Sequence, residues 1–173
     1  MRRIVVVVLG ILLTLSTALA CGDKLLVLGR GVSFAQIHKT DHPASILIYM
    51  SAASQLPAAD KDVQLQTILK LAGHKPKSIE ERAEFLRALT SEKYDFVVAG
   101  PADAGLLKGE IAAAPSKPML LTLLYKPSNE QLSAAQKQFT CAFKAERNNQ
   151  ILHVVDEAMK SRQGQSAPKC LAR

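Results

Sequence analysis

The chain has 173 residues, a length that suits one domain, and a formal net charge of +7 at pH 7. Its basic residues are scattered and are not interleaved with aromatic residues, which make up 5% of the chain. Surfaces that stack nucleic-acid bases need such aromatic side chains, so the composition argues against nucleic-acid binding. No two of the three cysteines form a CxxC pair, which argues against a thioredoxin-like redox function.

The first twenty residues have the pattern of a secretory signal peptide. Arg2 and Arg3 provide a positive start, residues 4–15 are apolar, and residues 18–20 read Ala-Leu-Ala, a cleavage-site pattern. The apolar run is shorter than the roughly 20 residues that span a bilayer. We therefore expect cleavage between Ala20 and Cys21 and export to the periplasm or the medium.

Cys21, at the new N-terminus, allows two interpretations. In a lipoprotein the cysteine at the cleavage point is acylated, and a leucine usually stands three positions before it. Here Ala18 has that position and Leu19 follows it, which favours ordinary cleavage and a soluble exported protein. The alternative is a lipoprotein anchored through Cys21, and membrane contact is expected only in that case.

Export would place the cysteines in an oxidising compartment, where disulfides form. Cys21, Cys141 and Cys170 are the candidates, and because three is an odd number at most one internal pair can form. The sequence leaves all three pairings open. Acylation of Cys21 would leave only the pair of Cys141 and Cys170.

The region after the signal peptide divides into three segments. Residues 21–44 are expected to form an N-terminal arm, in which Gly29 and Gly31 begin a G-x-G pattern but Phe34 has the position of the third glycine of a dinucleotide fingerprint. Residues 45–162 alternate between apolar runs and helical patterns and are expected to form the domain. Residues 163–173 are polar and are expected to be a flexible C-terminal tail.

Within residues 45–162, five extended segments alternate with five helical patterns. The expected strands are residues 45–50, 75–79, 96–99, 119–125 and 139–144, and the expected helices are residues 61–72, 82–90, 104–113, 129–137 and 148–162. Asp60 and Asp103 are expected to cap the first and third helices, and Ser78 with Glu81 resembles a capping box for the second. This alternation predicts a three-layer α/β domain with a doubly wound, parallel, five-stranded sheet in the order 2-1-3-4-5.

Two stretches of this domain resemble the response-regulator receiver family. YDFVVAGPADAG, residues 94–105, is similar to the family's third strand and the turn after it. FKAERNNQILHVVDEAMK, residues 143–160, resembles the fifth strand and the last helix. The resemblance covers roughly residues 45–162 and implies the flavodoxin-like fold of that family.

The residues that carry phosphoryl transfer in receiver domains are largely missing. The family has an acidic pair after its first strand to hold Mg²⁺, which needs hard oxygen ligands, but Met50 and Ser51 stand there. Gly100 stands where the phosphoacceptor aspartate would end the third strand. Thr122 is a loose match for the switch hydroxyl that follows the family's fourth strand. Lys144, which matches the lysine after the fifth strand, is the one chemical position that fits.

No metal site or cofactor is expected. His38 and His42 are spaced i, i+4, but Pro43 disfavours a helix there. We expect an exported, non-catalytic, receiver-like interaction or signalling scaffold with an unidentified protein partner in the cell envelope. It would bind at the carboxyl end of the sheet, and the candidate residues are Met50, Ser51, Gly100, Asp103, Lys126 and Lys144.

Two other functions remain open from the sequence. One is a periplasmic protein that binds a small anion in the same crevice, with Lys144 meeting the charge. The other is a thiol-dependent enzyme that uses Cys141 or whichever cysteine stays unpaired.

Overall fold

The computed structural model describes residues 39–164, apart from the side chains of Asn148 and Asn149. The expected signal peptide, residues 21–38 of the N-terminal arm and residues 165–173 of the tail lie outside the described residues. Cys21 and Cys170 lie there too.

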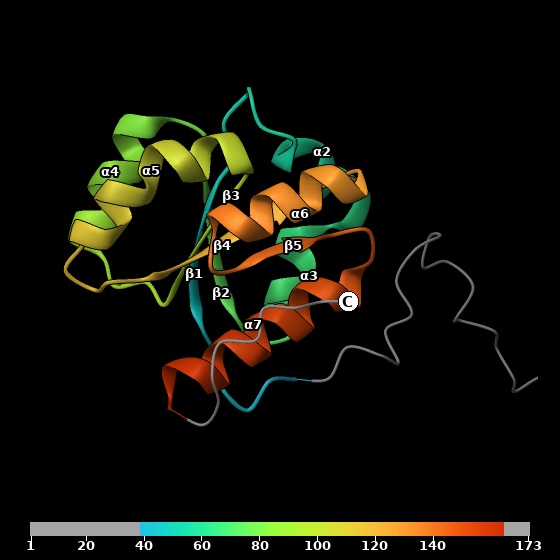
Figure 1. The fold of residues 1–173 in the computed structure, drawn as a ribbon. Helices are drawn as coiled ribbons and strands as arrows, with labels where there is room; N and C mark the ends of the chain where they lie inside the picture. The colour runs from blue at the N-terminus through green and yellow to red at the C-terminus, as the bar shows by residue number, and fades with distance from the viewer. Residues whose placement is uncertain (1–38, 165–173) are drawn as a thin grey trace, which may run out of the picture. The chain divides into compact units, whose positions relative to one another are not determined.

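A five-stranded parallel sheet forms the centre of the domain (Figure 1). The strands are β1 (Ser45–Tyr49), β2 (Lys75–Ile79), β3 (Phe96–Ala99), β4 (Met119–Leu124) and β5 (Ala142–Lys144). They lie in the order β2-β1-β3-β4-β5, so the predicted fold class is confirmed. β1, β3 and β4 lie inside the sheet and consist mostly of aliphatic residues, as strands covered on both faces do.

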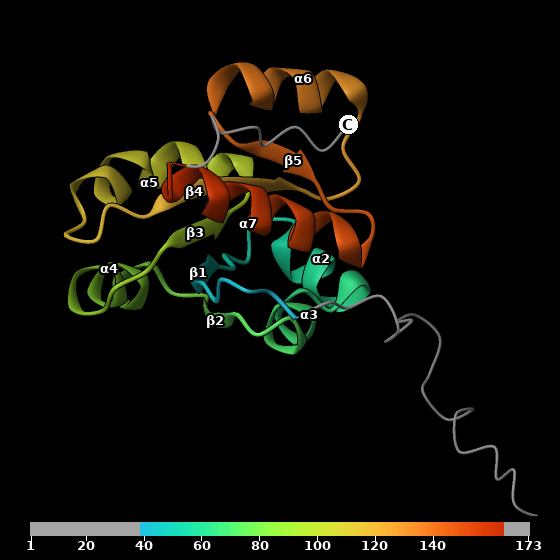
Figure 2. The same cartoon turned by 90° about the horizontal axis from the view of Figure 1, so that it is seen from below.

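Helices cover both faces of the sheet. They are α2 (Leu56–Val63), α3 (Leu65–Leu71), α4 (Arg82–Ser91), α5 (Pro101–Ala113), α6 (Asn129–Gln138) and α7 (Asn148–Arg162). Side chains of α2, α3 and α7 share one core cluster with the sheet, and those of α4, α5 and α6 pack in two clusters on the other face. Figure 2 shows α3 and α4 on opposite sides of β1 and β2. The domain therefore has three layers, as predicted.

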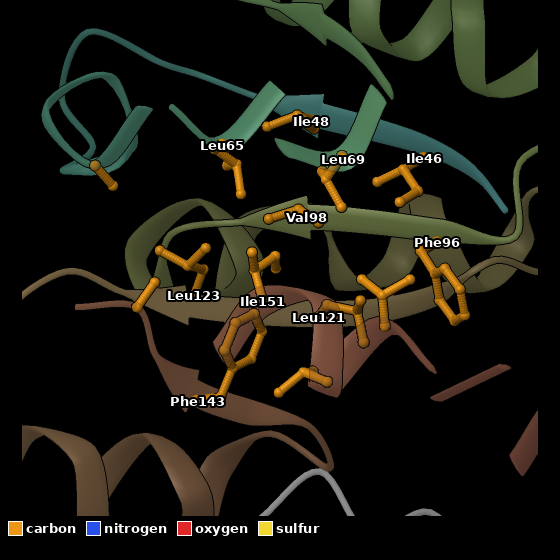
Figure 3. Close-up of a cluster of buried hydrophobic side chains, with 14 of the residues drawn as sticks. Ile46, Ile48, Leu65, Leu69, Phe96, Val98, Leu121, Leu123, Phe143 and Ile151 are labelled. Carbon is orange, nitrogen blue, oxygen red and sulfur yellow. The ribbon is translucent and has the colours of Figure 1, made fainter. Parts of the chain in front are cut away.

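Alternate residues of the strands fill the two faces, because successive side chains of a strand point in opposite directions. Figure 3 shows the larger cluster, in which side chains of four strands meet those of α3 and α7: Ile46, Ile48, Phe96, Val98, Leu121, Leu123, Phe143, Leu65, Leu69 and Ile151. On the opposite face, the rings of Tyr49 and Phe85 lie 5.0 Å apart between their centroids. The backbone of β1 is thus held between two cores.

The two edge strands differ from the inner ones in composition. β2 reads KPKSI, with its lysines exposed, and a proline such as Pro76 is tolerated at an edge, where no neighbouring strand needs its missing N–H. The predicted strand order places residues 75–79 at an edge of the sheet, and the position of β2 confirms this. β5, at the other edge, has only three residues.

The first predicted helix is in fact two helices. Residues 51–60 were expected to form a loop that ends at a capping Asp60, but α2 begins at Leu56 with a proline in its first turn. Gln64 adopts a left-handed conformation with φ of 49° and breaks the helix between α2 and α3. Asp60 lies inside α2, yet its carboxylate accepts a hydrogen bond from the backbone N–H of Gln66 at 3.0 Å. Asp60 therefore caps the first turn of α3, although it belongs to the preceding helix.

Two other predicted caps are wrong. Glu81 is itself the residue that precedes α4 and makes no side-chain cap, while Ser78 lies in β2, where its hydroxyl is buried and has no hydrogen-bond partner among the described residues. Asp103 does not precede α5, because that helix already begins at Pro101. Proline suits the first helical position, since the N–H it lacks would have no partner there.

Candidate binding pocket at the carboxyl end of the sheet

A pocket of about 380 Å³ opens at the carboxyl ends of the inner strands. Its walls are the loop after β1, the junction of β3 and α5, the end of β4 and one side of α6. The lining residues are Ala53, Ser54, Gln55, Gly100, Pro101, Ala102, Leu124, Pro127, Gln131, Ala134, Ala135 and Gln138. Doubly wound sheets bind ligands at this edge, beside the point where the strand order reverses. Small-ligand sites have volumes of about 300–1,000 Å³, so the pocket has a suitable size.

α6 forms the long wall of the pocket, and a capping box determines where it begins. The hydroxyl of Ser128 accepts a hydrogen bond from the Gln131 backbone N–H at 3.2 Å. In return, the Gln131 side-chain oxygen accepts one from the Ser128 N–H at 2.8 Å. Gln131, Ala134, Ala135 and Gln138 follow at i, i+3, i+4 and i+7, so they lie on one side of the helix. Sequence reasoning placed this helix but assigned it no part in binding.

Gly100 allows two walls of the pocket to approach each other closely. A Cβ atom on this residue would lie 3.3 Å from the Cβ of Ser54 and 4.0 Å from a carboxylate oxygen of Asp103. The backbone of Gly100, with φ of −69°, is open to any residue, so it is the close contact that favours glycine. A larger side chain would push the loop after β1 away from the start of α5.

Asp103 and Ser51 join the same two segments beside the pocket. The hydroxyl of Ser51 donates a hydrogen bond to the Asp103 carboxylate at 2.7 Å. Asp103 is buried and lies in the first turn of α5, where a negative charge is favourable because the N-terminus of a helix carries partial positive charge. Asp103 therefore stabilises α5 and the loop after β1, a function different from the predicted helix cap.

The Asp103 carboxylate also affects the pKa of Tyr49, the last residue of β1. Burial raises the pKa of the Tyr49 hydroxyl, and the negative charge of Asp103 raises it further, while Arg82 acts in the opposite direction. Arg82 is paired with Glu110 at 2.6 Å on the surface. The Tyr49 hydroxyl therefore stays neutral near pH 7.

The structure divides the six predicted site residues into two groups. Ser51, Gly100 and Asp103 come together, as described above. Met50 is buried, and its side chain belongs to the core on the α3 and α7 face. Lys126 and Lys144 do not line the pocket.

Both lysines have carboxylate partners on the surface. The ammonium of Lys126 lies 3.0 Å from the Asp62 carboxylate and 4.7 Å from the centre of the Tyr125 ring. The Tyr125 hydroxyl also donates to Asp62. These bonds, first from Tyr125 and then from Lys126, lower the pKa of Asp62. Lys144 lies 3.6 Å from Glu146.

Thr122, the loose match for a switch hydroxyl, is fully buried within β4. It pairs with Ala99 on one side and Ala142 on the other, and its hydroxyl has no hydrogen-bond partner within residues 39–164. A switch residue must reach the surface where a phosphoryl group would bind, and this one lies two residues before the end of its strand.

Cys141 is fully buried next to β5, in the core cluster on the α7 side. A cysteine that attacks a substrate is at least partly exposed, and Cys141 is not. Its predicted disulfide partners lie outside the described residues, so the pairing stays a prediction.

The described part of the chain holds no group of three or more His, Cys, Asp or Glu side chains arranged to bind a metal ion. Within the same residues, no helix is both long enough and apolar enough to cross a membrane. In comparisons with known proteins, no family model and no curated protein matches the chain.

Proposed function

We propose that this protein is an exported, non-catalytic binding module on a receiver-like scaffold, and that it takes a small ligand in the pocket beside α6. The observation that carries the proposal is the position and chemistry of the pocket. It lies at the edge where this fold class binds ligands, its volume is about 380 Å³, and no acidic residue lines it. The aspartates of a phosphoryl-transfer site are replaced by Met50, Ser51 and Gly100, which supports binding without chemistry.

Two variants of α6 test this proposal. Ala134 is exposed and lines the pocket, so Ala134→Leu should reduce the volume without disturbing the core. Gln136 is exposed on the same helix but does not line the pocket, so Gln136→Leu is the matched control. A ligand that binds the folded state raises the melting temperature.

We expect a screen of small molecules to find compounds that raise the melting temperature of the wild type and of Gln136→Leu, but not of Ala134→Leu. The proposal fails if no compound acts, or if the compounds act equally on both variants. Incubation with a small-molecule phosphodonor and Mg²⁺ should leave the mass of the protein unchanged.

A protein partner in the cell envelope is the second candidate. The observation that favours it is the exposure of the α6 wall, where Gln131, Ala134 and Gln138 are open to solvent. A partner could insert an apolar side chain into the pocket and cover this wall. In that case Ala134→Leu would weaken binding of the isolated partner, whereas no small molecule would raise the melting temperature.

A further inference from the structure

The lining of the pocket has no charged side chain. Eight of its twelve residues are alanine, glycine, proline or leucine, and the other four are Ser54, Gln55, Gln131 and Gln138. An ion that entered this pocket would lose water and gain no opposite charge, which is costly. The composition therefore selects against charged groups.

The start of α5 is a place of the kind that binds anions, because helix N-termini attract negative charge. Here the protein supplies that charge itself. Asp103 lies in the first turn of α5, buried directly behind Gly100 and held by Ser51. A Cβ atom on Gly100, which lines the pocket, would lie 4.0 Å from an oxygen of this carboxylate, so a second negative group in the pocket would be repelled by it.

The two nearby lysines do not change this conclusion. Lys126 and Lys144 are outside the lining and lie next to Asp62 and Glu146 respectively. The neighbouring carboxylates offset part of the positive charge of both lysines, which weakens their attraction for an anion. The predicted anion site around Lys144 therefore has less support than a site for a neutral molecule.

The polar groups that remain are carboxamides. The Ser54 hydroxyl is already used, because it donates to the Ser51 carbonyl at 2.9 Å and accepts from the Leu56 N–H at 3.3 Å. The oxygen of the Gln131 side chain accepts from Ser128, which leaves the NH₂ group of that side chain as a donor. Gln55 and Gln138 each bring both a donor and an acceptor.

We infer that the pocket binds an uncharged, mainly apolar molecule that carries a hydrogen-bond acceptor such as an amide carbonyl. This inference rests on the proposed function, since it names the ligand class for the same pocket. Apolar atoms of the ligand would cover the alanine and proline surfaces, and its carbonyl would accept from a glutamine NH₂ group.

Three probes of nearly equal size test the charge preference: cyclohexanecarboxamide, cyclohexanecarboxylate and cyclohexylmethylammonium. Binding is followed by NMR chemical-shift changes of ¹⁵N-labelled protein produced from the full chain, and the reporters are the amides of Gly100, Ala102, Ala134 and Ala135. We expect dissociation constants on the order of 1 mM for probes this small. We expect the carboxamide to shift these four signals and each charged probe to bind at least about tenfold more weakly.

A charged variant makes the test specific to the pocket. Gln138 is exposed and lines it, so Gln138→Lys should be tolerated and should allow the carboxylate to bind. Gln136→Lys, outside the lining, is the control and should not.

Each result has a separate meaning. If the carboxylate or the ammonium shifts the four pocket signals of the wild type as strongly as the carboxamide, the inferred ligand class is wrong but the binding site stands. If none of the probes shifts these signals, the inferred ligand class is wrong, and the melting-temperature screen with Ala134→Leu decides separately whether the pocket binds a small molecule at all. If the carboxamide acts and Gln138→Lys gains carboxylate binding, the inference is supported.

Discussion

His74 should make the stability of the domain depend on pH. The residue is 4% exposed and follows the C-terminus of α3, where Gly73 turns the chain with φ of 95°. Its Nδ1 accepts a hydrogen bond from the backbone N–H of Ala44 at 3.1 Å. This nitrogen can accept only while it carries no proton, so the folded protein holds the neutral imidazole.

Protonation of His74 would replace this hydrogen bond by a contact between two N–H groups. It would also place a charge in a buried site, where Nε2 has no hydrogen-bond partner among the residues described. Burial accordingly lowers the pKa of His74 below its usual 6.5, although the Asp156 carboxylate on α7 acts to raise it. Hydrogen bonds of Thr40 attach the segment before β1 close to His74. The Thr40 backbone N–H donates to the carbonyl of Ala72, and its hydroxyl donates to the carboxylate of Asp156.

The sign of the pH effect follows from this lowered pKa. Between pH 6.5 and the lower pKa of the folded state, the unfolded chain binds more protons than the folded chain. The contribution of neutral His74 to the free energy of unfolding is therefore fully present above pH 6.5. It decreases as the pH falls below 6.5, by at most about 1.4 kcal/mol for each pH unit. Loss of the bond from Ala44 is part of this effect, since a buried hydrogen bond contributes about 0.5–1.5 kcal/mol.

Urea unfolding of the wild type and of His74→Asn, between about pH 5 and pH 7, measures the effect. Asparagine can still accept from Ala44 but does not titrate, so the variant should lose stability less steeply as the pH falls. Other titrating groups are common to both proteins and cancel in the difference. His153 is exposed, and His153→Asn is the matched control, which should follow the wild type. Parallel curves for the wild type and His74→Asn would refute the reasoning.

Three further changes have expected outcomes. Thr122→Val should raise the free energy of unfolding by about 1 kcal/mol, because it removes a buried hydroxyl without a described partner; a loss of stability in urea unfolding would show that the hydroxyl is satisfied. Ser51→Ala should lower it by about 1–3 kcal/mol, because buried Asp103 loses its donor, whereas exposed Ser133→Ala should change little in the same assay. The intact mass of the protein from cell envelopes should correspond to a chain that begins at Cys21 and carries no acyl chains. A mass that includes Met1 would contradict export. Added acyl chains would establish a lipoprotein.

The sheet could be predicted from the sequence because its signals are local. Mainly apolar runs such as residues 96–99 and 119–124 are typical of strands that are buried on both faces, as the inner strands of a parallel sheet are. The polar KPKSI segment suits only an edge. The alternation of such runs with helical patterns then leaves few arrangements, and the observed order is one of the two common ones.

Helix ends were predicted less well, because a capping side chain is recognised by its spacing in sequence but acts through space. Asp60 accepts from a helix other than its own, and Asp103 accepts from Ser51, which is 52 residues away in the chain. The sequence suggested Asp60 as a cap but not the break between two helices across which it acts, and it contains no sign of the contact between Asp103 and Ser51. The Ser128 box, in contrast, is local, and its S-x-x-Q spacing could have been identified.

The sequence alone was enough to predict the fold class and the strand order, because apolar runs and helical patterns alternate regularly along residues 45–162. Only the tertiary structure decided that a pocket opens at this edge and which residues line it. The pocket is made by segments from the β1 loop to α6, which are far apart in the chain, and mostly by alanine, glycine and proline. Such residues carry no chemical signal in sequence, because what they contribute is empty space. That space exists only after the segments around it have packed.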